Sequence, residues 1–171
     1  AIPHIIVRLK QNAIKLNKLS IADFSDAQQD FWSTIQLFDS VRAIYMGNQA
    51  GKFIYIQQEN GQFSSKEVTE VPERKIYSLD RLGQKQKLLE VDEYDPRLRP
   101  WYINTYRTQK NNWSQIYTFT RGELGITTAG FLRDSQGETQ GIVGVDLILS
   151  GIGKFLQKIE ISENGQIFIL E

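Results

Sequence analysis

Hydrophobic positions recur at three- and four-residue intervals through the first part of the chain, which is the spacing of an amphipathic helix. The first series predicts a helix from Ile5 to about Leu19. Ser25 and Gln28 then have the spacing of a capping box, and a second series follows them. Residues 1–40 are therefore expected to form a long N-terminal helical segment, in one or two pieces. The apolar positions are Ile5, Ile6, Leu9, Ala13, Leu16 and Leu19, then Phe31, Trp32, Ile35, Phe38 and Val41.

From Arg42 onward the pattern changes to short alternating runs separated by turn residues, which predicts strands and hairpins. Asn60-Gly61 has the composition of a tight hairpin turn, and Pro100 suits the first turn of a helix that reaches about Thr108. A helical segment followed by hairpins with helical inserts predicts an antiparallel α+β domain. The expected strands are 42–46, 52–57, 75–79, 85–89, 115–120, 126–132, 141–149 and 166–170, with a further helix over 151–159.

Composition limits the chemistry that the chain can perform. The 171 residues carry 20 basic and 20 acidic side chains, so no basic excess indicates a nucleic-acid surface. Disulfides and thiolate metal sites are excluded because the chain has no cysteine, and its single histidine, His4, argues against histidine-based catalysis. No apolar run approaches the roughly 18–20 residues that span a bilayer. Because the chain begins with Ala, we expect it to be a processed or excised piece of a longer protein.

Two segments resemble ligand-binding motifs only loosely. Residues 47–52 (GNQAGK) have one residue too few between the glycines for a phosphate-binding loop, and Phe53 stands where Ser or Thr would hold Mg²⁺. The acidic residues of 90–95 lack the glycine and the terminal glutamate of a helix-loop-helix calcium site. A plain turn and a solvated loop are the better interpretations, and we predict no metal and no cofactor.

The nonapeptide YDPRLRPWY, residues 94–102, is the strongest candidate site. Pro100 favours an extended Arg99, from which a five-donor guanidinium can reach a carboxylate. Trp101 adds an indole N–H, and Tyr94 and Tyr102 add hydroxyls on rigid rings. Such a pocket suits a small anion or zwitterion. The alternative is a filled core in which Arg97 or Arg99 pairs with Asp95.

Asp146 lies inside the apolar run GIVGVDLIL, where an unpaired carboxylate would be costly. A helix N-cap is one explanation, although Leu147–Leu149 continue the strand. The other is an aspartate directed into a pocket, where it would receive an ammonium group. Tyr117 lies in the preceding alternating strand, SQIYTFT.

The segments YDPRLRPWY, SQIYTFT, GITTAGFLRD and GIVGVDLILSGIGKFL, together with AIYMGNQAGKFI and the leading helix, resemble the double Cache family of extracytoplasmic sensor domains. The resemblance covers essentially the whole chain. It implies a long N-terminal helix (1–40), a membrane-distal PAS-like ligand-binding module (41–160) and the start of a truncated membrane-proximal module (161–171). Receptors of this family include chemoreceptors, histidine kinases and nucleotide cyclases.

The amino-acid-binding subset of that family carries a set of residues that this chain matches at Tyr94, Arg99, Trp101, Tyr102, Tyr117 and Asp146. The resemblance implies that Arg99 and Trp101, with Tyr102 nearby, grip the ligand carboxylate. It also implies that Asp146, helped by Tyr94 and Tyr117, receives the α-ammonium. Phe119 stands where the subset commonly has an aspartate, which leaves a different small carboxylate open as the ligand.

The sequence thus predicts a non-enzymatic, extracytoplasmic sensor domain of a membrane receptor, which binds an α-amino acid or a related small carboxylate. A homodimer through the N-terminal helix is an expected partner arrangement, and membrane attachment is expected only in the full-length protein. Two alternatives remain open: a structural or dimerisation module with no small ligand, and a sensor for an amine or organic acid. An enzyme is disfavoured because no nucleophile–base pair is visible.

Overall fold

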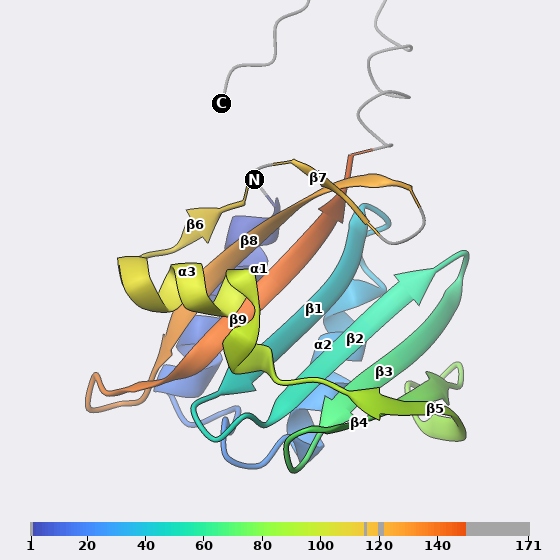
Figure 1. Ribbon diagram of the computed structural model, residues 1–171, viewed down its shortest axis with the longest axis horizontal. Coiled ribbons are helices and arrows are strands. Elements are labelled where there is room, and N and C mark those ends of the chain that lie inside the picture. Colours follow the sequence, from blue (N-terminus) through green and yellow to red (C-terminus); the bar gives the residue numbers. More distant parts are fainter. Residues whose placement is uncertain (1, 115, 120–121, 150–171) are drawn as a thin grey trace, which may run out of the picture.

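The structure, a computed structural model, describes residues 2–114, 116–119 and 122–149. Its centre is a nine-stranded antiparallel sheet in the order β5-β4-β3-β2-β1-β9-β8-β6, with β7 also paired to β8 (Figure 1). The predicted α+β, PAS-like arrangement is confirmed. In chain order the elements are α1 (Ile2–Lys15), α2 (Ser25–Ile35), β1 (Val41–Asn48), β2 (Phe53–Glu59), β3 (Gln62–Val68), β4 (Glu73–Leu79), β5 (Lys85–Glu93), η1 (Pro96–Leu98), α3 (Pro100–Thr108), β6 (Asn112–Trp113), β7 (Tyr117–Thr118), β8 (Leu124–Arg133) and β9 (Thr139–Ile148).

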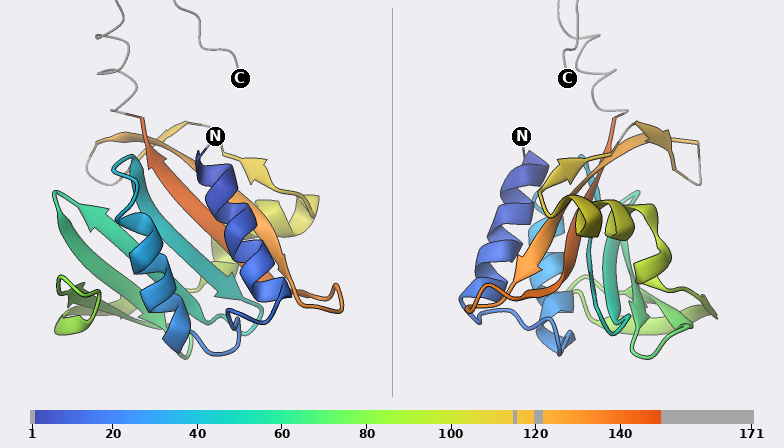
Figure 2. Two further views of the ribbon diagram at one scale, coloured as in Figure 1. Left: turned by 180° about the vertical axis from the view of Figure 1, so that it is seen from behind. Right: turned by 60° about the vertical axis from the view of Figure 1, so that its left-hand side comes forward.

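The helices cover opposite faces of the sheet. Helix α1 packs against β8 and β9, and α2 packs beside it against β1 and β2 (Figure 2). Helix α3 crosses the other face over β8 and β9. We call these the α1–α2 face, which carries Ile44 and Ile54, and the α3 face, which carries Tyr45 and Phe53. The main apolar core lies under α1 and α2, so the α3 face is left for more polar and aromatic side chains.

The buried side of α1 differs from the predicted apolar stripe. Ile6, Val7 and Ile14 face the sheet, whereas Leu9 and Leu16 are exposed to solvent. Lys10 also lies on the buried side because its ammonium is fully engaged by α2. It donates to the Asp30 carboxylate at 2.6 Å and to the Thr34 hydroxyl at 2.7 Å. An ion pair thus joins the two helices on the buried side of α1. Ile5 is exposed as well.

The predicted capping box at the start of α2 is wrong. The helix begins at Ser25 itself, so Ser25 is not the N-cap residue, and Phe24 caps without a side-chain hydrogen bond. The Ser25 N–H donates instead to the Asp23 carboxylate at 3.0 Å. Gln28 is drawn away from the helix start because its amide donates to the Gly83 carbonyl at 2.9 Å. The contact with the β4–β5 turn therefore replaces the local cap.

The predicted hairpins are present, with two additional strands, β3 and the two-residue β6. Asn60 and Gly61 have φ of 51° and 74°, as a tight β2–β3 turn requires. The sequence did not predict β3, because Ser64, Ser65 and Lys66 interrupt its hydrophobic alternation. Residues 62–93 consequently form three strands joined by turns, of which the sequence predicted the second and the third. The expected helix over 151–159, the strand over 166–170 and the segment 161–171 lie outside the described residues.

One edge of the sheet is formed by β5, whose residues are almost all exposed. Its register with β4 shifts between Ile76 and Tyr77 and again between Ser78 and Leu79. Such irregularities bend a strand and interrupt its row of free backbone groups. The edge is therefore long but uneven.

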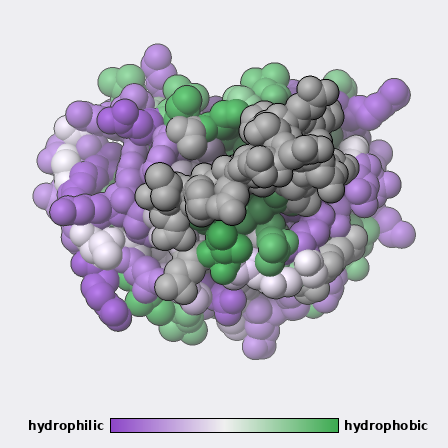
Figure 3. Space-filling model, turned by 90° about the horizontal axis from the view of Figure 1, so that it is seen from above, coloured by the Kyte–Doolittle hydropathy of each residue, from purple (hydrophilic) through white to green (hydrophobic). Residues whose placement is uncertain are grey.

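The end of the molecule at which α1 begins carries apolar side chains on a mostly hydrophilic surface (Figure 3). Ile2, Ile116 and Leu124 come from elements that meet at this end, and they are 42%, 56% and 53% exposed. Within the described residues, no helix is both long enough and apolar enough to cross a membrane.

Two glycines allow a matched test of the α2 contact. Gly83 and Gly61 have nearly the same φ, 75° and 74°. A Cβ on Gly83 would lie 2.5 Å from the Trp32 ring, whereas a Cβ on Gly61 would meet nothing within 4 Å. We expect Gly61→Ala to cost about 1 kcal/mol from backbone strain alone. Gly83→Ala should cost about 1–3 kcal/mol more because Trp32 must move. Urea unfolding of both variants measures the difference, and equal losses would contradict the packing of the turn on α2.

Candidate ligand-binding site

Asp146 is the charged centre of the α3 face. It lies on β9 between Ala43 of β1 and Thr127 of β8, and it is 6% exposed. Its Oδ1 accepts hydrogen bonds from the Tyr45 hydroxyl and the Thr127 hydroxyl, each at 2.7 Å. Burial raises the pKa of Asp146 to about 6, and these two hydrogen bonds oppose the rise. The predicted cost of a buried aspartate is thus met by hydrogen bonding within the strand layer, and no helix cap is involved.

Tyr117 extends this hydrogen-bonded chain. Its hydroxyl lies 2.6 Å from the Thr127 hydroxyl. When Asp146 is ionised, Thr127 gives its one hydroxyl proton to the carboxylate, so Tyr117 must be the donor to Thr127. Burial and the charge of Asp146 raise the pKa of Tyr117 to about 12, which keeps its proton in place at neutral pH. Three hydroxyl groups are therefore oriented around one carboxylate.

Aromatic rings form the wall beside Asp146. The Tyr45 ring meets the Trp101 ring edge-on, with 4.9 Å between the ring centres. It stacks with the Tyr55 ring, with 5.2 Å between the ring centres. The Trp101 indole N–H donates to the Tyr94 hydroxyl at 3.3 Å, and Tyr94 packs on Phe53 at 4.7 Å.

The nonapeptide is held by the local backbone that the sequence predicted. Arg99 is extended, with φ −92° and ψ 145°, and α3 begins at Pro100. A Cβ on Gly47 would lie 3.0 Å from Pro96 and 3.2 Å from Trp101, so glycine at the end of β1 permits the close approach of this segment. Trp101 is consequently fixed over Tyr45.

The two arginines of the nonapeptide differ in role. Arg97 binds the Asp95 carboxylate with two nitrogens, at 2.9 and 2.7 Å, which was one of the pairings considered from the sequence. Arg99 is exposed, and its guanidinium lies 5.8 Å from the centre of the Tyr94 ring. Within the part of the chain that the structure describes, Arg99 has no ion-pair partner. It is the arginine that remains available for a ligand.

The structure brings together most of the predicted site residues but separates one of them. Tyr94, Trp101, Tyr117 and Asp146 surround the Tyr45 ring or its hydrogen-bonded neighbours, and Arg99 lies at Tyr94. Tyr102 instead is 5% exposed in a small apolar cluster under α3, and its ring stacks with the Tyr106 ring. A contact between Tyr102 and a ligand stays a prediction.

Several side chains near the site were not singled out from the sequence. Tyr45 and Tyr55 alternate with core residues in β1 and β2, so strand parity places them with Ala43 on the α3 face. Thr127 is identified only by its hydrogen bond to Asp146. Lys66 lies on the unpredicted strand β3 and so escaped notice. The parity of β1 and β2 was the one sequence signal that pointed to this face.

Phe119 occupies the position at which the sequence comparison suggested an aspartate. Its ring meets Tyr117 edge-on at 5.0 Å. It also covers Gly125, where any added Cβ would collide with the ring. A phenyl ring therefore closes this side of the site, and the acceptors for a cation are concentrated at Asp146.

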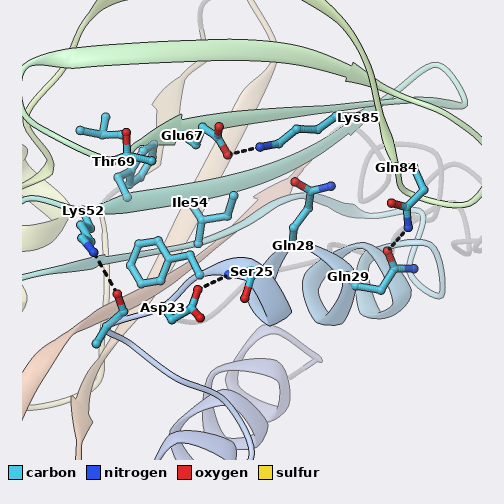
Figure 4. Close-up of a pocket in the computed structure, with 14 residues that line it drawn as sticks. Asp23, Ser25, Gln28, Gln29, Lys52, Ile54, Glu67, Thr69, Gln84 and Lys85 are labelled. Carbon is cyan, nitrogen blue, oxygen red and sulfur yellow. Dashed lines mark hydrogen bonds and ion pairs between the residues drawn. The ribbon is translucent and has the colours of Figure 1, made fainter.

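A groove of about 600 Å³ lies away from this cluster, between the start of α2 and the strands β2 and β3 (Figure 4). Its polar side chains mostly bond to one another across the groove. Lys85 pairs with Glu67 at 2.6 Å, Lys52 donates to the Ala22 carbonyl at 3.1 Å, and the Gln84 amide donates to Gln29 at 3.2 Å. The Gln84 bond joins the β4–β5 turn to α2, the Lys52 bond holds the segment before α2, and the Lys85–Glu67 pair joins β5 to β3. Because these polar groups satisfy one another, we interpret the groove as a structural contact.

The sequence of this chain matches one protein-family model. The family is described as methyl-accepting chemotaxis protein-like, first PDC sensor domain, and it matches residues 45–154. No curated protein is similar enough in sequence to count as a match.

Solved structures share the fold at low sequence identity. The ligand-binding domain of the Pseudomonas aeruginosa amino acid chemoreceptor PctC, in complex with GABA, has a TM-score of 0.59 and 16% identity, and the match covers 92% of this chain and 56% of that one. The extracellular domain of the putative histidine kinase mmHK1S-Z3 has a TM-score of 0.61 and 14% identity. The match covers 94% of this chain and 56% of that one. The ligand-binding domain of the Campylobacter jejuni chemoreceptor Tlp3, in complex with 4-methylisoleucine, has a TM-score of 0.51 and 16% identity. The match covers 82% of this chain and 44% of that one. The chain thus spans about half the length of each.

The raised pKa of Asp146 makes the stability of the unliganded protein depend on pH. Between the ordinary carboxyl pKa of 3.8 and the folded value of about 6, the native state holds a proton that the unfolded state has lost. The contribution of Asp146 to the free energy of unfolding is therefore highest below pH 3.8. It falls by about 3 kcal/mol in total as the pH rises from 3.8 through 6.

Asp146→Asn removes this dependence while its side-chain oxygen still accepts from Tyr45 and Thr127. The difference in unfolding free energy between the variant and the natural protein should grow in the variant's favour from about pH 4 to pH 7 and then level off. Urea unfolding across that range measures it. A difference that does not change with pH would show that Asp146 titrates normally.

Proposed function

This chain belongs to the family of methyl-accepting chemotaxis protein-like first PDC sensor domains, as its resemblance to double Cache domains predicted, and we propose that it binds an α-amino acid on its α3 face. One observation carries the proposal. Asp146 and Arg99, of opposite charge, lie at the two ends of the row of rings formed by Tyr45, Trp101 and Tyr94. A zwitterion presents charges of both signs within a few bonds, so the arrangement fits its two ends.

The ammonium end would lie at Asp146. Its Oδ1 is occupied by two hydrogen bonds, which orient the carboxylate and leave the other oxygen to a ligand. An ammonium group beside Asp146 would lower its raised pKa, so binding would be accompanied by loss of the proton.

The carboxylate end would lie at Arg99 and the Trp101 indole. Arg99 can offer two parallel N–H donors to a carboxylate, and the Trp101 N–H now directed at Tyr94 can be shared with it. Tyr102, under α3, would contribute by supporting Trp101, whose ring it meets edge-on at 5.6 Å. The neighbouring structures with bound GABA and 4-methylisoleucine support a small amine-bearing acid as the ligand class.

Binding, and not catalysis, is the activity that we propose. His4 lies on α1 against Trp113, with its ring nitrogen 3.3 Å from the Thr128 hydroxyl. Thr128 points away from the side of β8 on which Thr127 meets Asp146, so the histidine is separated from the site by the sheet. A structural module without a ligand remains the alternative, and it is favoured only if the aromatic wall proves to be closed.

The whole receptor would carry this chain outside the cytoplasm, attached to a membrane by segments beyond it. We infer a helical segment at 1–40, a ligand-binding module at 41–160 and the start of a second module at 161–171. The signal would pass through β8, because Thr127 holds Asp146 while the adjacent Thr128 contacts His4 of α1. A ligand that shifts Asp146 would thereby shift the helix.

Arg99→Ala tests the carboxylate assignment. Because Arg99 is exposed and unpaired, the variant should keep its melting temperature, whereas affinity for the amino acid that binds best should fall about 10- to 100-fold with the loss of a charge-assisted contact. Calorimetric titration measures it. Arg97→Ala is the matched control, since Arg97 is bound to Asp95 and should leave affinity unchanged. Equal effects of both variants would refute the assignment, and no binding of any amino acid to the natural protein would favour the structural module.

The exposed seam of α1 is the proposed dimer contact. Ile2, Ile5 and Leu9 of α1, and Leu16 just after its end, are 42–62% exposed. They lie three, four and seven residues apart, which suits the contact side of paired helices. Leu9→Lys places a charge in the middle of this seam in both copies, so dimerisation measured by sedimentation should weaken about tenfold or more. Leu37→Lys, at a 71% exposed leucine outside the seam, is the control. A monomeric natural protein, or equal behaviour of both variants, would count against the seam.

A further inference from the structure

A cross-strand row on the α3 face connects the site to a lysine. Tyr45 of β1 is paired with Tyr55 of β2, and Tyr55 is paired with Lys66 of β3. Paired residues in an antiparallel sheet project from the same face. Since Tyr45 bonds to Asp146, Lys66 lies on the face that carries the proposed ligand site. The stacked rings of Tyr45 and Tyr55 lie between the Asp146 carboxylate and the Lys66 ammonium, and we call this pair the tyrosine floor.

Lys66 is a cation without a partner of its own. Its ammonium lies 5.0 Å from the centre of the Tyr55 ring, and it makes no ion pair or hydrogen bond with any described residue. Burial lowers the pKa of Lys66 and the positive charge of Arg74 lowers it further, and these two effects outweigh the opposing negative charges of Asp92, Asp146 and Glu90. Both effects mean that the ammonium is held where an additional negative charge would stabilise it.

The carboxylates nearest to Lys66 are engaged or distant. Asp92 is bound by two nitrogens of Arg74, at 2.7 and 2.5 Å. Glu90 continues the row beyond Ile76 but is exposed on the edge strand β5, outside ion-pair distance of Lys66. Neither neutralises the lysine.

The charges of the site are therefore unequal. Arg74 and Asp92 cancel each other, which leaves Arg99 and Lys66 as cations and Asp146 as the anion. The zwitterionic part of an amino acid satisfies Arg99 and Asp146 and leaves Lys66 unpaired. An ammonium half-buried without a counter-charge costs free energy that a matching ligand group recovers.

We propose that Lys66 binds a carboxylate in the ligand's side chain, so that the site selects an acidic α-amino acid. The inference rests on the proposed function and names the ligand class of the same site. Strands β9 and β3 are three strand intervals apart, about 14 Å. The Lys66 ammonium lies 5.0 Å from the centre of the Tyr55 ring, and Asp146 accepts from the hydroxyl of the neighbouring Tyr45. Both charges thus lie beside the tyrosine floor, and the separation that remains is to be bridged by a small dicarboxylic amino acid.

Selectivity should appear as a preference for an acid over the amide of the same shape. L-Glutamate and L-glutamine, or L-aspartate and L-asparagine, differ by a charge and hardly in size. A site that presents an unpaired ammonium favours the acid by about 10- to 100-fold, because a hydrogen bond between two charged groups is stronger than one to a neutral amide.

The experiment is calorimetric titration of the natural protein, Lys66→Met, Lys66→Arg and Lys75→Met with these four amino acids. Lys66→Met should lose the preference by weakening acid binding while amide binding stays the same. Lys66→Arg should retain most of it. Lys75 lies on β4 opposite Glu67, a residue of the α2 groove, so Lys75→Met should behave like the natural protein. Melting temperatures establish that each variant is folded.

The outcomes separate the two claims. Binding of amides as tightly as acids by the natural protein, or an acid preference that survives in Lys66→Met, overturns the role of Lys66 and leaves amino-acid binding intact. Absence of binding for these four and for every other amino acid overturns the proposed function itself. An acid preference that is lost in Lys66→Met and kept in Lys66→Arg supports both.

Discussion

The arrangement of the α3 face depends on one buried carboxylate. Asp146 interrupts the most apolar strand of the chain, and the sheet accommodates it because Tyr45 and Thr127 on the flanking strands both donate to the same oxygen. Those two donors in turn fix their neighbours. Tyr45 supports Trp101 and Tyr55, and Thr127 orders Tyr117. Without the carboxylate, these hydroxyl groups would lack a common acceptor in the middle of the sheet.

Local patterns predicted the elements whose boundaries are set by local chemistry. Pro100 started α3 as expected, and Asn60-Gly61 made the tight turn, because both depend on backbone preferences of the residues themselves. The capping box failed because Gln28 has a distant partner in the β4–β5 turn, which no local rule detects. The stripe of α1 failed for the same reason, since Lys10 is buried by an ion pair with a residue twenty positions away.

The sequence predicted only part of the site, because the remaining residues depend on strand pairing. Resemblance pointed to Arg99, Trp101 and Asp146, but their supporting residues come from strands whose pairing the sequence does not state. Lys66 shows this most clearly. It becomes relevant only once β3 is paired with β2, which places it in register with Tyr55. The separation of Tyr102 from Asp146 likewise follows from the direction of a helix, because adjacent helical residues point to different sides.

The uneven edge at β5 has a consequence for a protein held among many copies of itself. A straight, exposed edge with apolar side chains such as Leu88 and Val91 offers a template on which further strands can be added. Here the two shifts in register interrupt the spacing of the free backbone groups, and Lys85 and Lys87 add charge along the same strand. The edge is therefore a poorer template for added strands, which opposes fibrillar growth from β5.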